Sequence, residues 1–89
     1  MNYKEAIKIF KTEFPDLTVT KCIDYDDEHF VIEAVKDLKQ SDYNSPYYAV
    51  GKADKQITGF IPSFDLDAFF DAIENRTVYS RGHWLKIIY

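Results

Sequence analysis

Large apolar residues recur at helical spacing near both ends of the chain. In residues 2–14 they return every three or four positions, as on one face of a helix: Tyr3, Ile7, Phe10 and Phe14. Asn2 followed by Glu5 fits a helix-capping pattern, and Pro15 ends the helix. A second stripe of this kind predicts another helix and consists of Leu66, Phe69, Phe70 and Ile73.

Between the two predicted helices, four stretches are predicted to be strands: 17–23, 29–35, 47–51 and 57–61. The first of them alternates apolar and polar positions with the period of a strand. In the first, Leu17, Val19 and Ile23 share one side, and Lys21 is the misfit on that apolar side. The turns after the first and third stretches are short, so we expect antiparallel hairpins, and residues 36–46 read as a polar loop.

The last segment, residues 76–89, ends in Trp84-Leu85-Lys86-Ile87-Ile88-Tyr89, which has strong strand propensity. We expect this end to add a strand to the sheet or to pair with the edge of another chain. The pattern predicts an α+β fold of one domain, residues 1–89. Its antiparallel sheet has four strands, or five with the end segment. An N-terminal and a C-terminal helix pack on one face, in the order α-β-β-β-β-α(-β).

Length and composition indicate a small cytoplasmic globule. The 89 residues suit one domain with a modest core. There is no secretory signal and no apolar run near the roughly 20 residues that span a membrane, so we expect no membrane partner. The single cysteine, Cys22, cannot form an internal disulfide, which favours a reducing compartment.

The net charge of −4 is unevenly distributed along the chain. Residues 1–75 hold all 15 acids and 8 of the 11 Lys and Arg, for a net charge of −7. Residues 76–89 hold the other three bases and no acid. The acidic body should repel nucleic acid, and three cations are a weak footprint for it. We expect no nucleic-acid partner and expect the basic end to pack on acidic protein surface.

Metal binding has one candidate, the acidic turn that begins at residue 24. Asp24, Asp26 and Glu28 alternate like the first ligands of a calcium loop. The pattern then fails, because the sixth position is His29 instead of glycine and the twelfth is Val35 instead of a bidentate Glu. We therefore predict no metal site, and the acids suit an exposed turn.

No pattern indicates an enzyme or a cofactor. Cys22 and His29 flank the acidic turn and are potential cross-strand neighbours, but no third group is placed to orient them. Gly51 and Gly59 lie too far apart, with no third glycine, for a phosphate-binding loop. We predict a non-enzymatic protein with no catalytic residue.

Aromatic residues in or near the predicted loops are the best candidates for a partner-binding surface. Aromatic side chains carry much of the energy of protein interfaces, and acids surround several of these. The alternative is that they cover the ends of a small core. The candidates are Tyr25, Tyr43, Tyr47, Tyr48 and Trp84.

Three segments carry a resemblance to known proteins: Pro46-Tyr47-Tyr48-Ala49-Val50, then Ile57 to Pro62, then Asp65 to Phe70. Together they resemble small uncharacterised proteins from phages and prophages of Gram-positive bacteria. The tyrosine strand, turn and second strand are also similar to bacterial immunity domains of the YrhB type. Either resemblance implies a small, non-catalytic, cytoplasmic protein that works by binding another protein.

We therefore expect a protein-interaction module, encoded by a phage or another mobile element. One alternative is an immunity-type inhibitor that blocks a toxin with its acidic face. Another is a structural protein that self-assembles into an oligomer through Trp84 to Tyr89.

Overall fold

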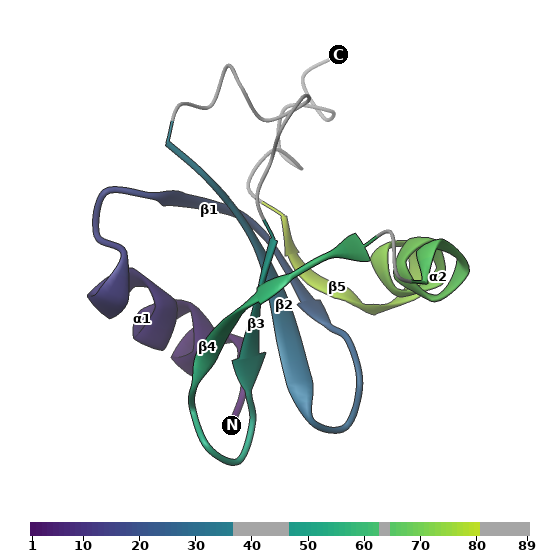
Figure 1. Cartoon of the computed structure of the whole chain (residues 1–89), viewed down its shortest axis with the longest axis horizontal. Helices are drawn as coiled ribbons and strands as arrows, with labels where there is room; N and C mark the ends of the chain where they lie inside the picture. Colours follow the sequence, from purple (N-terminus) through teal and green to yellow (C-terminus); the bar gives the residue numbers. More distant parts are fainter. Residues whose placement is uncertain (37–46, 63–64, 81–89) are drawn as a thin grey trace.

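The computed structural model describes residues 1–36, 47–62 and 65–80, which form two helices and one five-stranded sheet (Figure 1). In chain order the elements are α1 (Tyr3–Glu13), β1 (Thr18–Asp24), β2 (His29–Val35), β3 (Tyr47–Gly51), β4 (Ile57–Phe60), α2 (Leu66–Arg76) and β5 (Thr77–Ser80). All neighbouring strands are antiparallel, in the spatial order β4-β3-β2-β1-β5. The predicted α+β class and the predicted order of elements are confirmed.

The ends of α1 follow the capping pattern of the sequence. The side chain of Asn2 accepts a hydrogen bond from the Glu5 N–H at 2.9 Å, which satisfies one free donor of the first turn. At the other end the Phe14 N–H donates to the Phe10 carbonyl, just before Pro15. Ala6 and Phe10 are the buried residues of the helix.

A bulge at Thr20 changes the expected alternation of β1. Val19 lies opposite Ala34, but Lys21 lies opposite Glu33, so one residue of β1 has no counterpart in β2. As a result Val19 faces the α1 side of the sheet, whereas Ile23 packs on the α2 side. The prediction that Val19 and Ile23 share one side was wrong, because a strict period of two cannot anticipate an inserted residue.

The β3–β4 hairpin closes through a turn from Gly51 to Gln56. The Gly51 N–H donates to the Gln56 carbonyl at 2.9 Å, and Lys55 adopts a positive φ of 60°. A Cβ at Gly51 would lie against the Asp54 carboxylate, so a side chain there would require the end of the Asp54 side chain to move. The pairing of β3 with β4 shows no register shift.

The two helices cover opposite faces of the sheet, as Figure 1 shows with α1 and α2 on either side of it. The prediction that both pack on one face was wrong. The reason lies in β2, which carries apolar side chains on both faces, Phe30 and Ile32 on one and Val31 on the other. Such a strand needs cover on each side. Phe10 of α1 joins the first cluster, and Phe69 of α2 joins the second.

The fifth strand is formed by Thr77–Ser80, which follows α2 directly and pairs with β1. The strand expected from Trp84 to Tyr89 lies outside the described residues. Within the described residues, no helix combines the length and the apolar character that crossing a membrane requires.

Candidate protein-binding surface

Helix α2 exposes two large apolar side chains to solvent. The carboxylate of Asp65 caps the helix by accepting a hydrogen bond from the Ala68 N–H at 3.2 Å. Phe69 and Ala72 are buried against the sheet, but Leu66 is 47% exposed and Phe70 is 59% exposed. Leu66 and Phe70, which we call the α2 strip, are four residues apart and therefore neighbours on the helix surface. The apolar stripe seen in the sequence is therefore only partly buried, although such a stripe is expected to face the core.

Acidic side chains border the α2 strip on the side away from the sheet. Successive helical residues are about 100° apart, so Glu74 and Asp67 follow Phe70 around the helix, and Asp71 comes next. All three are exposed. No basic residue lies on this side of α2. The α2 strip therefore lies between the buried core and three exposed acids, which we call the acidic rim: Asp67, Asp71 and Glu74.

A continuous row of aromatic rings connects the α2 strip to the β1–β2 turn. Ring centroids are 5.0 Å apart for Tyr25 and Phe60, 5.8 Å for Phe60 and Phe69, and 6.1 Å for Phe69 and Phe70. Tyr25 is half-buried in this row. Partial burial, followed by the charges of Asp65 and Asp26, raises the pKa of Tyr25 above its usual value. One of the predicted tyrosines thus lies in an acidic aromatic environment.

Tyr47 lies on the same face of the sheet, but its contacts are with the core. Its ring packs edge-on against Phe69, with centroids 5.0 Å apart. Its hydroxyl donates to Glu33 Oε2 at 2.7 Å, and the Thr20 hydroxyl donates to Glu33 Oε1 at 2.5 Å. Glu33 is only 6% exposed, so the two hydroxyls satisfy a buried carboxylate.

The remaining predicted residues are not brought to this surface. Tyr48 lies on the opposite face, where its half-buried ring packs against Phe10 and Phe14 with centroids 5.0 Å and 5.4 Å away. Tyr43 and Trp84 lie outside the described residues. Of the candidates that the structure describes, Tyr25 and Tyr47 therefore share the α2 face and Tyr48 does not.

The acidic β1–β2 turn is held by its own hydrogen bonds. Asp26 Oδ1 accepts from the backbone N–H groups of Glu28 and His29 at 2.9 Å and 2.7 Å. Partial burial works against the carboxylate, but these N–H groups and the His29 ring outweigh it and lower the pKa of Asp26. Lys52 Nζ donates to Asp24 Oδ1 and to the Asp26 carbonyl, each at 2.6 Å. The acids of this turn thus organise the loop.

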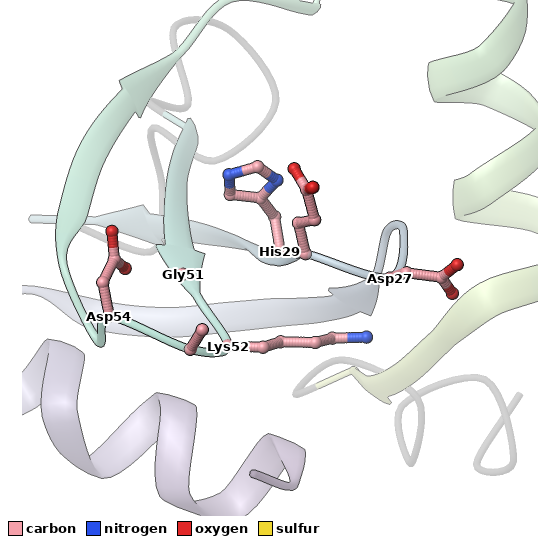
Figure 2. Close-up of a pocket in the computed structure, with 7 residues that line it drawn as sticks. Asp27, His29, Gly51, Lys52 and Asp54 are labelled. Carbon is pink, nitrogen blue, oxygen red and sulfur yellow. The ribbon is translucent and has the colours of Figure 1, made fainter.

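A shallow hollow lies beside this turn and is lined by residues of the β1–β2 and β3–β4 turns (Figure 2). The charged side chains around it do not converge on one point. Asp27 and Asp54 lie on opposite sides of it and point apart, and His29 points away from Lys52. Among the described residues no group of three His, Cys, Asp or Glu is placed to hold a metal ion.

Cys22 and His29 are also separated. Cys22 lies opposite Ile32 and is buried on the α1 face, whereas His29 lies opposite Gly51 at the start of β2. Burial, and then the charge of Asp24, raises the pKa of the Cys22 thiol from 9.0 to about 12. A protonated, buried thiol is a poor nucleophile. The potential cross-strand pair is not formed.

Comparison with protein family models, with curated proteins and with solved structures finds no match to this chain.

Proposed function

We propose that the chain is a non-enzymatic protein-interaction module that binds its partner through the α2 strip and the acidic rim. The exposure of Leu66 and Phe70, beside the buried Phe69 of the same helix, carries this proposal. Large apolar side chains next to a partly buried aromatic row, with a polar rim, are typical of interface centres.

The chemistry of the surface defines the partner. Phe70 and Leu66 need an apolar counterpart, and Asp67, Asp71 and Glu74 favour Lys or Arg around it. An immunity-type inhibitor of a basic toxin is the variant that the acidic rim favours. The net charge of −4 argues against nucleic acid as the partner. The free, buried thiol of Cys22 is compatible with the reducing cytoplasm of a bacterium, where a phage-encoded protein would also work.

Pull-down from a lysate of the source organism tests this proposal. The baits are the full chain, Phe70→Ser, and Val78→Ser as a control that removes a 41% exposed apolar side chain from β5. We expect one protein in equal amount with the wild type and the control, released by high salt and lost from Phe70→Ser. All baits must have the same melting temperature.

Two outcomes would overturn the proposal. One is a folded wild-type bait that retains no protein. The other is a partner retained equally by Phe70→Ser, because binding would then lie elsewhere on the chain. A photo-crosslinking residue at position 70, compared with one at position 78, identifies the contact directly. We expect the crosslinked segment of the partner to contain Lys or Arg beside apolar residues.

A further inference from the structure

Strand β4 lies at one end of the sheet that the described strands form. Among the described strands only β3 pairs with it. The Gly51 N–H bonds to the Gln56 carbonyl, and hydrogen-bonded pairs alternate along an antiparallel ladder. With the regular register of β4, this alternation turns the backbone groups of Thr58 and Phe60 toward β3 and those of Ile57 and Gly59 outward.

This edge is short, but it carries no charge, proline or bulge that would prevent strands from pairing. Its residues, Ile57-Thr58-Gly59-Phe60, include no charge and no proline, and its pairing with β3 has no bulge. Gly59 adds no side chain, and the space where a Cβ would lie is empty to 4 Å. The opposite edge differs, because β5 pairs with β1 through a register shift.

We propose that β4 pairs with β4 of a second copy of this chain, which makes a twofold dimer with a continuous sheet. The twofold axis of such a sheet is perpendicular to it, so one residue must lie opposite its own copy. In the proposed dimer Gly59 is that residue, because it directs both backbone groups outward and has no side chain to crowd its own copy at the axis. Thr58 then lies opposite Phe60 of the second copy, and Ile57 opposite Ile61.

The side chains and charges at the edge fit a second copy. Ile61 is 54% exposed, and the proposed register places it opposite the half-buried Ile57. No like charges meet along an uncharged strand. The charges beside β4 are satisfied within one copy, since Lys55 Nζ already pairs with Glu5 Oε2 at 3.3 Å, so they neither oppose nor drive the pairing.

The dimer does not depend on the α2 strip. Rotation about an axis perpendicular to the sheet leaves its two faces in place, so both α2 helices lie on the same face of the dimer. A short edge buries less surface than a standard interface, so association should depend on concentration.

Sedimentation of the full chain over concentrations from about 5 to about 500 µM tests the proposal. We expect the mass to rise from 10.5 kDa toward twice that value. Gly59→Lys should raise the dissociation constant at least about tenfold, because it places two ammonium groups at the axis. The control Val78→Lys makes the same charge change at the opposite edge and should dimerise like the wild type. Phe70→Ser should also dimerise normally.

A wild-type chain that stays monomeric throughout would overturn the proposal. So would a Gly59→Lys variant that dimerises like the wild type, or an equal loss of dimer in Val78→Lys. Amide exchange in the wild type provides a measurement without a variant. The Ile57 and Gly59 amides should become protected as the concentration rises, and exchange that is independent of concentration would also reject the β4 interface.

Discussion

At the scale of single residues, Glu33 is the charged side chain that the described part of the chain buries. It lies on the central strand β2, is nearly fully buried, and accepts hydrogen bonds from the Thr20 and Tyr47 hydroxyls. A buried carboxylate is costly unless donors satisfy it. Two residues that look like ordinary strand formers therefore have a specific role, since they make an acid tolerable inside the α2-side core.

Tyr47→Phe should reduce the free energy of unfolding by about 1 to 3 kcal/mol at neutral pH, because it leaves Glu33 Oε2 without its donor. Burial, then the hydrogen bond to Glu33 and the charge of Glu33, raises the pKa of Tyr47 above its ordinary 10.0. This contribution is fully present below pH 10 and is lost as the pH rises toward the folded-state pKa. Urea denaturation of both proteins from pH about 7 to about 11 should show their difference shrinking above pH 10.

A double-mutant cycle with Glu33→Gln separates the loss of the hydrogen bond to Glu33 from other effects of removing the Tyr47 hydroxyl. If the hydroxyl acts through Glu33, the two single changes are non-additive by about 0.5 to 3 kcal/mol. Equal stability of Tyr47→Phe and the wild type would instead show that water satisfies this carboxylate.

At the scale of elements, α2 should show a sharp contrast between adjacent phenylalanines. Phe69→Ala should reduce the free energy of unfolding by about 3 to 5 kcal/mol, because the ring is buried against Ile23 and Val31. Phe70→Ala should change it by no more than about 0.5 kcal/mol, because most of that ring already contacts water. Urea denaturation of the two variants measures both values, and similar losses would mean that the α2 strip is covered in solution.

The orientation of α2 was predictable only in part. The spacing of Leu66, Phe69, Phe70 and Ile73 predicts a helix with an apolar face, which is confirmed, but four large residues cover more of the surface than this helix buries. Ala72 was the missed signal. A small residue lies where a helix comes close to its neighbour, so the face centred on Phe69 and Ala72 was the better choice.

The hairpins were predictable because their patterns are local. The bounds of β2 and β3 follow from their strand-forming residues and from the turns beside them, and the capping of α1 follows from Asn2 and Glu5. The bulge at Thr20 was not, because it is defined by pairing with β2 and by the hydroxyl bond to Glu33. Partners across the sheet are far apart in sequence, and alternation within one strand does not specify them.

The candidate site was predictable by residue type but not by position. Tyr47 and Tyr48 point to opposite faces, as the alternation of a strand requires, and each packs against a different core. An aromatic residue near a loop has similar neighbours in sequence whether it anchors a partner or covers a core. Only the three-dimensional packing separates Tyr47, which supports Glu33, from Phe70, which faces solvent.

At the scale of the whole molecule, one sheet lies between two cores. Cys22 belongs to the α1 core and its neighbour Ile23 belongs to the α2 core, although both are residues of β1. Loss of packing on one face therefore weakens a strand that the other face needs. We expect the described elements to unfold as one cooperative unit.

The thiol of Cys22 reports on this coupling. The Cys22 side chain is fully buried, so a thiol-reactive reagent in solution near pH 8 can label it only after the fold opens. Phe69→Ala, on the opposite face, should accelerate labelling about a hundredfold if it costs about 3 kcal/mol, since the rate follows the population of the open form. Phe70→Ala is the matched control and should label within about twofold of the wild type. Faster urea unfolding of Phe69→Ala without faster labelling would mean that the α2 face opens alone while α1 continues to protect Cys22.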